Sequence, residues 1–309
     1  MTDSTTPAPA LLAWAGKELG VRVSVTTDTP HPRRTARANS GENSRGNPRV
    51  WVLRRPDGAL FHLKVSPQPL AYERETLALR HAVPALGAGR APQLRASNAA
   101  HLALLLTTVQ GRPLRHPAVS PAEEVQAHRQ GGALLARLHE AGDLSGPRRT
   151  EAERALWTAA DGAAPLLRRA ADRITAAEHG YVRDLTERLR VLPPLPLAFI
   201  HGAARPRNLL WSRSTEQAGW IGFERARFAP VVQDFVRMSC GIWADRPDLR
   251  AACFQGYGRG LVPEERHALK ALAALDAVRC LVRGPALADH EVTARGRRTL
   301  NRLTAGVFV

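Results

Sequence analysis

The sequence predicts an α+β fold in two lobes, a small one rich in β-strands followed by a larger one that is mostly helical. Strand-like alternation is concentrated before residue 110, whereas segments with helix start and stop signals dominate residues 111–309. With 309 residues, 44% of them hydrophobic, the chain is long enough to bury a core in each lobe.

The strands of the first lobe are bounded by turn residues. The clearest pair is joined by Pro56-Asp57-Gly58, a sequence typical of a tight turn between antiparallel strands. The elements expected here are a helix at Pro9–Leu19, strands at Val21–Val25, Arg49–Leu53 and Ala59–Val65, a helix at Leu70–Arg80, and strands at Pro92–Ala96 and Leu102–Thr107.

The second lobe opens with Ser120-Pro121-Ala122-Glu123, in which serine suits the N-cap, proline the first helical position and glutamate the third. The helices expected in this lobe run from there to Glu140, from Thr150 to about Ala171, from Thr175 to before Pro193, on both sides of a turn at Asp245–Pro247, and over Pro263–Arg283 and His290–Leu303.

Three short apolar runs interrupt the helical lobe and carry polar residues at their ends. The runs Leu197–Ile200, Leu209–Trp211 and Trp220–Phe223 indicate strand, loop, strand, turn and strand. The loop begins at His201 and ends at Asn208, and polar residues also follow the third strand.

This segment, residues 199–224, resembles the catalytic and metal-binding segments of the aminoglycoside phosphotransferase and choline kinase-like family, relatives of the protein kinases. In that family the loop reads H-G-D-x-x-x-x-N, and the third strand ends in I-D-[FW]-E. Ala203 and Gly222 stand where the family has its two aspartates. The resemblance implies a bilobal, protein-kinase-like fold. The positions that match are His201, Gly202, Asn208, Ile221, Phe223 and Glu224.

The two replaced aspartates carry the chemistry of the kinase template. The loop aspartate accepts the proton of the attacking hydroxyl, and the strand-end aspartate holds the magnesium that bridges the phosphates. General-base catalysis contributes about 10²–10⁴-fold, and the metal contributes several kcal/mol more. Ala203 and Gly222 supply neither group, so no intact catalytic pair accompanies the remaining His201 and Asn208. The resemblance therefore implies a pseudokinase.

Lys64 is one of only three lysines in a chain that otherwise uses arginine, and it lies in an apolar strand. An unpaired ammonium group there is costly. By the resemblance, Lys64 is the lysine that contacts the α- and β-phosphates of a nucleotide, and Glu75 is its partner. Glu73, on a different face of the same helix, is the rival partner. The alternative is that Lys64 is a solvated strand residue.

Two more segments have counterparts in the family. Asn39–Gly46, reading NSGENSRG, is the candidate for the loop that covers the phosphates, and the alternative is a mobile surface loop. Thr108–Leu114 resembles the connection that receives the adenine. The boundary is therefore expected near residue 110, with an N-lobe at 1–110 and a C-lobe at 111–309.

Loss of the two aspartates is expected to leave an electropositive cleft. Lys64, His201, Arg205 and Arg207 are the candidate anion-binding residues, for a nucleotide without metal, a carboxylate or a phosphorylated ligand. The alternative is that the arginines point to solvent. His201 also suits a structural role in the loop.

Glu224 and Asn208 are the remaining candidates for a metal. Strand alternation places positions 222 and 224 on the same face, so Glu224 is a possible substitute for the lost aspartate. Asp234 matches an aspartate that steadies the catalytic loop through hydrogen bonds, and it is expected to be structural. His139 is expected to be a packed or capping histidine.

The net charge of +16 comes almost entirely from arginines spread along the chain. An anionic small molecule or an acidic peptide or protein explains this charge; a nucleic-acid partner is the alternative, but no motif supports it. No apolar run reaches the length of a membrane span, and the N-terminus lacks signal-peptide features. The three cysteines indicate buried thiols in a reducing cytoplasm. The oligomeric state is not set by the sequence.

Three functional hypotheses follow. The first is a pseudokinase that binds a ligand or partner, in a bacterial biosynthetic pathway, with ATP or another nucleotide bound without Mg²⁺ as the candidate cofactor. The second is an active small-molecule or peptide phosphotransferase that uses Glu224 and Asn208 for the metal. The third is repurposed chemistry in the same cleft, such as elimination or adenylyl transfer through Lys64 or His201.

Overall fold

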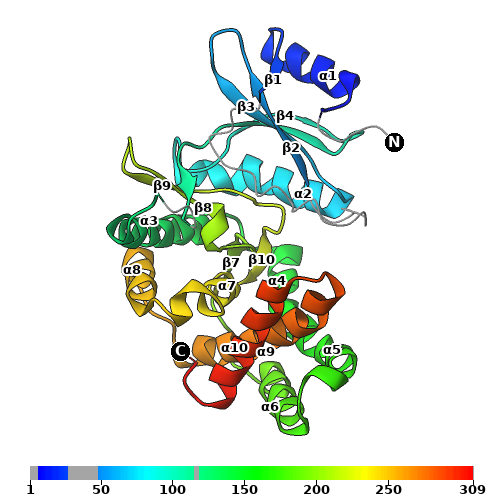
Figure 1. Ribbon diagram of the computed structural model, residues 1–309, viewed down its shortest axis with the longest axis vertical. Coiled ribbons are helices and arrows are strands. Elements are labelled where there is room, and N and C mark those ends of the chain that lie inside the picture. Colours follow the sequence, from blue (N-terminus) through cyan, green and yellow to red (C-terminus); the bar gives the residue numbers. More distant parts are fainter. Residues whose placement is uncertain (1–5, 27–47, 115–117, 309) are drawn as a thin grey trace. The chain divides into compact units, whose positions relative to one another are not determined.

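A five-stranded antiparallel sheet forms the framework of the N-terminal region in this computed structural model, which describes residues 6–26, 48–114 and 118–308 (Figure 1). The candidate phosphate loop Asn39–Gly46 lies outside the described residues. The strands are, in sheet order, β1 (Ser24–Thr26), β2 (Arg49–Arg54), β3 (Leu60–Val65), β5 (Ala103–Thr107) and β4 (Leu94–Asn98).

Contacts divide the chain into two compact units. The first combines Met1–Ala127 with Arg207–Ala226, and the second combines His128–Pro206 with Arg227–Val309. This division is a matter of contact density and does not test the lobe boundary near residue 110, which stays a prediction.

Alternation along the strands gives the sheet of the first unit one apolar face. Helix α1 (Pro9–Leu19) packs on this face through Leu11 and Ala15. Because side chains alternate along a strand, the neighbour of Leu63 at position 64 projects to the opposite face. The strand residues that share the core with α1 are Trp51, Leu53, Phe61, Leu63, Ala103 and Leu105.

Helix α2 (Pro69–Leu77) continues into a π-helical turn at Ala78–Ala82 and belongs to the same unit. A three-stranded sheet completes it: β6 (Arg112–Pro113), β8 (Leu209–Ser212) and β9 (Gln217–Trp220). The predicted strand Trp220–Phe223 is misplaced, because β9 spans Gln217–Trp220 and shares only Trp220 with it; beyond β9, Gly222 adopts a φ of 82°. Strand residues have negative φ, so the chain is no longer in an extended strand at Gly222.

The second unit is mostly helical around one short antiparallel pair, β7 (Leu197–Ile200) and β10 (Arg227–Pro230). Its central helix, α9 (Pro263–Ala286), is buried along much of its length, and α10 packs against it. Helix α3 (Pro121–Glu140) crosses the division between the units. The other helices are α4 (Gly146–Asp161), α5 (Ala163–Arg169), α6 (Ala176–Glu187), α7 (Val236–Ser239), α8 (Pro247–Tyr257) and α10 (His290–Thr304).

The structure corrects several predicted boundaries. The strand expected at Val21–Val25 is β1, three residues later at its start, and the helix expected from Thr150 to Ala171 begins at Gly146 and is divided at Gly162. Strands β6 and β10 were not expected, because each is short and is defined by its partner strand rather than by an apolar run.

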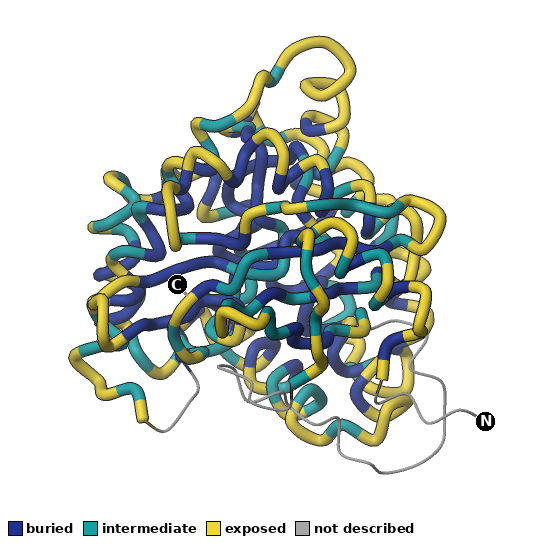
Figure 2. The backbone as a smooth tube through the Cα atoms, turned by 90° about the horizontal axis from the view of Figure 1, so that it is seen from above, coloured by how far each residue is buried: buried dark blue, intermediate teal, exposed yellow. Residues whose placement is uncertain are grey.

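Most buried residues are apolar, and exposed residues lie mainly in the outer turns (Figure 2). Cys240, Cys253 and Cys280 are buried free thiols, as expected, and burial raises the pKa of Cys253 to about 12. In the described ranges, no helix combines the length and the apolar character needed to cross a bilayer.

Candidate functional site

Lys64 lies at the centre of a buried ion cluster in the first unit. Its Nζ is 2.7 Å from both carboxylate oxygens of Glu75 on α2 and 3.0 Å from Oε2 of Glu224, which follows β9. The side chains of Lys64 and Glu75 are 8% and 3% exposed, whereas that of Glu224 is 24% exposed. The expected pairing of Lys64 with Glu75 is therefore present, and Glu224 is a second partner that the sequence did not reveal.

The two carboxylates keep the buried ammonium charged. Burial by itself lowers the pKa of Lys64, but attraction to Glu75 and Glu224 outweighs burial, so the pKa lies above its usual value. Burial raises the pKa of Glu75, and the neighbouring Glu224 raises it further, while Lys64 opposes both effects. The cluster carries one positive and two negative formal charges, so it is not electropositive at this point.

Glu75 also ties α2 to the turn after β9. Besides the lysine, its carboxylate accepts a hydrogen bond from the backbone N–H of Phe223, which is fully buried. The rival Glu73 lies on the exposed side of the helix. One carboxylate thus links the helix, strand β3 and the turn that carries Gly222 and Glu224.

Gly222 lies beside Asn208 in the same unit. A Cβ at position 222 would lie 3.2 Å from Nδ2 of Asn208, and the N–H of Ile221 donates to the backbone oxygen of Asn208 at 2.9 Å. The asparagine is thus held next to the position where the family has its metal-binding aspartate. The chain has already left the strand at Gly222, which is the alternative to continued strand alternation, so alternation does not place residues 222 and 224 on one face.

The donors present here do not fit a magnesium ion. Mg²⁺ prefers carboxylate oxygens in near-octahedral geometry. The only carboxylate of the candidate pair, that of Glu224, accepts a hydrogen bond from the ammonium of Lys64. Across the described part of the chain, no group of three or more His, Cys, Asp or Glu residues could hold a metal.

The loop after β7 is held by Asp234 in the second unit. Oδ2 of Asp234 accepts from the backbone N–H of His201 at 2.7 Å, and Oδ1 accepts from that of Gly202 at 2.6 Å. The predicted role of Asp234 in steadying this loop is therefore visible in its contacts. Burial alone raises its pKa, but hydrogen bonds and charge interactions from His139 and His201 outweigh burial, so the pKa of Asp234 lies below its usual value.

His139 and Tyr257 extend this network. Nε2 of His139 is 3.0 Å from Oδ2 of Asp234, and Nδ1 is 2.8 Å from the hydroxyl of Tyr257. An ionised carboxylate only accepts, so Nε2 carries a proton, and the Tyr257 hydroxyl can donate to Nδ1. Burial raises the pKa of Tyr257 to about 12, which keeps that hydroxyl protonated. His139 is thus a packed residue, as expected, and Tyr257 was missed because it lies 118 residues away.

His201 and Ala203 complete the loop without a base. His201 is fully buried, and its Nδ1 accepts from the backbone N–H of Ala203 at 3.2 Å. The imidazole therefore buttresses the loop, and burial argues against its use as an anion ligand. Ala203 is 2% exposed, and its methyl group takes the position of the expected carboxylate.

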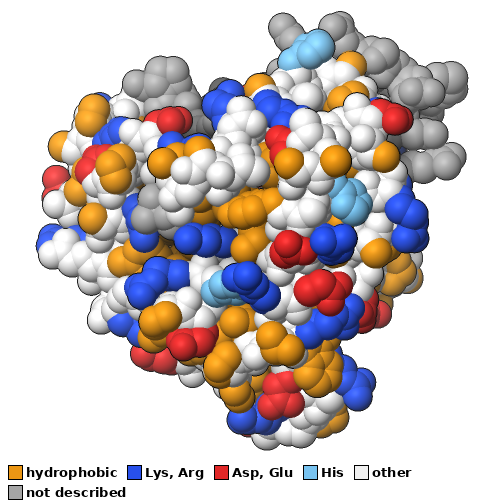
Figure 3. Space-filling view, turned by 90° about the horizontal axis from the view of Figure 1, so that it is seen from below, with side chains coloured by type: hydrophobic (Ala, Val, Ile, Leu, Met, Phe, Trp, Pro, Cys, Tyr) orange, Lys and Arg blue, Asp and Glu red, His pale blue; other side chains and the backbone are white. Residues whose placement is uncertain are grey.

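The remaining anion candidates belong to different units. Lys64 and Arg207 lie in the first unit, and His201 and Arg205 lie in the second. Arg207 is exposed and Arg205 is half-buried. Lys and Arg side chains are also spread over the face seen in Figure 3, between acidic and apolar ones, rather than gathered in one patch.

Comparison with known structures supports the fold. A macrolide 2'-phosphotransferase, MphH from Brachybacterium faecium, has a TM-score of 0.59 at 17% identity, with 94% of this chain and 97% of that one covered. The complex of gentamicin with APH(2")-IIa has a TM-score of 0.62 at 13% identity, with 99% of each chain covered. A choline/ethanolamine kinase family protein from Mesorhizobium loti has a TM-score of 0.59 at 18% identity, with 87% and 89% covered.

No curated protein matches the chain significantly. The solved structures are distant in sequence and show the fold alone, which confirms the predicted α+β, bilobal, kinase-like fold. The model of the phosphotransferase enzyme family, in contrast, matches residues 41–272, a range that includes Lys64 in the first unit and Asp234 in the second. The chain therefore belongs to the phosphotransferase enzyme family of aminoglycoside phosphotransferase type.

Proposed function

We propose that this chain is a catalytically impaired phosphotransferase, a pseudokinase that binds a ligand instead of phosphorylating it. The observation that carries the proposal is Ala203, buried in a loop whose backbone is held in place by Asp234. The loop keeps its support but has no carboxylate to orient and deprotonate a hydroxyl. Without that base, transfer would be slower by about 10²–10⁴-fold.

The lack of metal-binding groups in the described part of the chain also supports this proposal. Gly222 offers no ligand beside Asn208, and Glu224 is bonded to Lys64. The proposed ligand is therefore anionic and bound without Mg²⁺: ATP or another nucleotide is the first candidate, and a carboxylate or phosphorylated compound is the second. The ammonium group of Lys64 would bind the negative charge of this ligand once Glu224, the more exposed of its two partners, moves aside.

The proposed role is that of a binding or partner module. Its net charge of +16 favours an acidic peptide or protein as the partner. A bacterial biosynthetic pathway, in the cytoplasm, is the setting that we propose by analogy with other phosphotransferase-like proteins. The relatives with solved structures are named as phosphotransferases of macrolides and aminoglycosides, and none of those substrates is assigned to this chain.

The test is a thermal-shift titration with ATP and ADP, each with and without Mg²⁺, beside an assay of ATP consumption. A ligand that binds only the folded state raises the melting temperature. We expect a shift that does not need Mg²⁺ and no ATP consumption above background. A shift that requires Mg²⁺, accompanied by ATP consumption, would overturn the proposal in favour of an active phosphotransferase. No shift with any nucleotide would remove nucleotides as the ligand.

Two variants sharpen this titration. Glu224→Gln removes the negative charge next to Lys64, and Glu73→Gln makes the same change at an exposed site on α2 outside the cluster. If the nucleotide uses Lys64, only Glu224→Gln should alter the shift. Equal effects of the two variants would indicate general electrostatics instead of a site at Lys64.

A further inference from the structure

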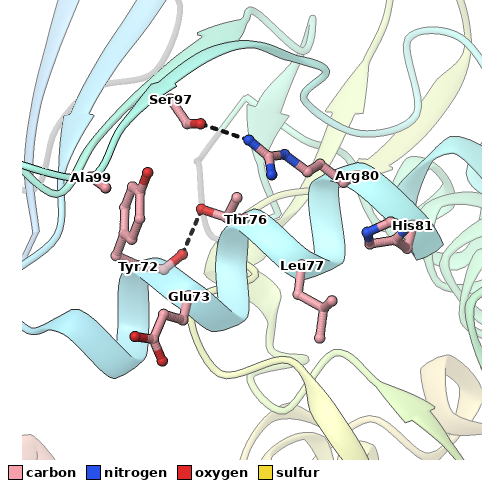
Figure 4. Close-up of a pocket in the computed structure, with 8 residues that line it drawn as sticks. All are labelled: Tyr72, Glu73, Thr76, Leu77, Arg80, His81, Ser97 and Ala99. Atoms are coloured by element: carbon pink, nitrogen blue, oxygen red, sulfur yellow. Dashed lines mark hydrogen bonds between the residues drawn. The ribbon is translucent and has the colours of Figure 1, made fainter.

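The outer side of α2 lines a groove that the ion cluster does not use. The groove encloses about 440 Å³, a size within the range of ligand pockets, and all its lining residues belong to the first unit (Figure 4). Ser97 of β4 and Ala99, in the turn after this strand, form one wall. The other wall comes from α2 and its π-helical turn: Tyr72, Glu73, Thr76, Leu77, Arg80 and His81.

The helix presents apolar side chains at this surface. Leu77 lines the groove and is 36% exposed, and Leu70, on the same helix, is 54% exposed. Seven residues are close to two helical turns, so both leucines lie on one side of α2. The two leucines thus give this side of α2 an apolar strip, next to the groove, that a partner segment can cover.

A positive charge stands at one end of the groove. The guanidinium of Arg80 donates to Oγ of Ser97 at 2.9 Å, and this partner is neutral. Among the residues that the structure describes, no carboxylate forms an ion pair with Arg80. His81 lies beside it, and Glu73 lies nearer the other end of the lining helix. An arginine in this state offers a carboxylate a charge-assisted, two-pronged hydrogen bond.

We propose that this groove is the docking site for an acidic, amphipathic segment of a partner protein. An apolar side chain of the segment packs against Leu77, and a carboxylate binds Arg80. The polar and apolar groups of the groove match such a segment better than a uniformly charged ligand, because the walls between Arg80 and Glu73 are largely uncharged. The class of partner rests on the proposed function, but the surface itself does not.

The position of the groove gives docking a consequence for the ion cluster. Glu75 lies between groove residues along α2, on the face that holds Lys64 and the N–H of Phe223. A segment seated against α2 therefore stabilises the helix that supplies the main partner of Lys64. The link runs through one rigid element of two turns and a half, so no longer relay is required.

Fluorescence anisotropy with the full chain and no nucleotide tests the surface. The probe is a fluorescein-labelled peptide of repeated Glu-Glu-Leu-Leu units, and the same peptide with lysine in place of glutamate is its charge control. We expect the acidic peptide to bind and Arg80→Glu to weaken binding by about five-fold or more, as expected when an ion pair worth up to about 1 kcal/mol is reversed. Leu77→Asp should weaken binding by a similar factor, because it removes the apolar contact and adds a charge that repels the peptide.

Two matched variants exclude trivial explanations. Arg298→Glu, at an exposed arginine of α10, changes the net charge as much as Arg80→Glu does, and Leu287→Asp removes an exposed leucine of the second unit. We expect both to bind like the unmodified chain. All four substitutions are at exposed positions, and thermal melting checks that each variant is folded.

The outcomes separate clearly. Equal weakening by Arg80→Glu and Arg298→Glu would mean that the peptide binds through the overall charge, and the proposal would fall. Equal binding of the lysine peptide, or no binding of the acidic one, would overturn it as well. Because no nucleotide is present, each of these failures leaves the proposed nucleotide site at Lys64 untouched, and a negative nucleotide titration leaves the groove untouched.

Discussion

Oε2 of Glu224 lies 3.0 Å from Nζ of Lys64, although 160 residues separate the two along the chain. The lysine that resemblance assigns to nucleotide phosphates is thus shared between two carboxylates of its own chain. Any anion that approaches Lys64 must compete with one of them. Glu224, with a side chain 24% exposed, is the one that can leave, because Glu75 is buried and also bonded to Phe223.

Replacing Glu224 should therefore tighten anion binding. In Glu224→Gln the side chain keeps its size but loses the charge that competes for Lys64. We expect ATP to bind about two- to five-fold more tightly without Mg²⁺, since partly exposed ion pairs contribute up to about 1 kcal/mol. Isothermal titration calorimetry measures the change, with Glu73→Gln as the control. Weaker binding in Glu224→Gln would mean that the carboxylate assists the ligand instead of opposing it.

Removing Lys64 should lower the free energy of unfolding far more than removing an exposed lysine does. Lys64→Met leaves Glu75 buried without its cationic partner, and breaking a buried pair costs about 3–5 kcal/mol. Lys17→Met makes the same change at an exposed position and should stay within about 0.5 kcal/mol of the unmodified chain. Urea unfolding measures both. Similar stabilities for the two variants would show that the cluster at Lys64 contributes little.

The sequence predicted Lys64 and Glu75 as site residues, but it did not predict all the groups that they contact. Lys64 was identifiable because lysine is rare in this chain and costly in an apolar strand, and Glu75 because helical spacing separates it from Glu73. The bonds to Glu224 and Phe223 were not predictable, since they depend on how a turn returns to α2 from far along the chain.

The same limit explains the errors in the secondary structure. Apolar character alone placed the third strand at Trp220–Phe223, whereas β9 spans Gln217–Trp220 and the positive φ of Gly222 lies beyond its end. Strand β10 has no alternating pattern of its own and exists because it pairs with β7. Local pattern thus predicted the long elements, and pairing between distant segments decided the short ones.

The contribution of Asp234 to the stability of the protein should fall in strong acid. The pKa of Asp234 lies below its ordinary value of 3.8, so folding favours the ionised form. Its contribution is therefore fully present above about pH 4 and is lost as the pH falls through the folded pKa. Asp234→Asn should lower the free energy of unfolding at pH 7 by about 2 kcal/mol or more, because hydrogen bonds to a charged group are lost.

Melting temperatures between pH 7 and pH 2 check this dependence. The difference between the unmodified chain and Asp234→Asn should be constant down to about pH 4 and should shrink below it. Asp172→Asn, at an exposed position of the same unit, should show no such narrowing. A difference that stays constant into strong acid would mean that shape, and not charge, is what Asp234 contributes.

Gly222→Asp tests whether the lost metal ligand can be restored. Asp is among the few non-glycine residues that tolerate a positive φ, and its Cβ would lie 3.2 Å from Nδ2 of Asn208. Gly222→Ala adds the same Cβ but no ligand, at a backbone strain of about 1–2 kcal/mol, since alanine tolerates a positive φ less well than aspartate. We expect only the aspartate variant to acquire a thermal shift with ATP that requires Mg²⁺. ATP consumption should stay at background, because Ala203 still provides no base. Magnesium dependence in both variants, or in neither, would contradict the assignment of position 222 as the missing metal ligand.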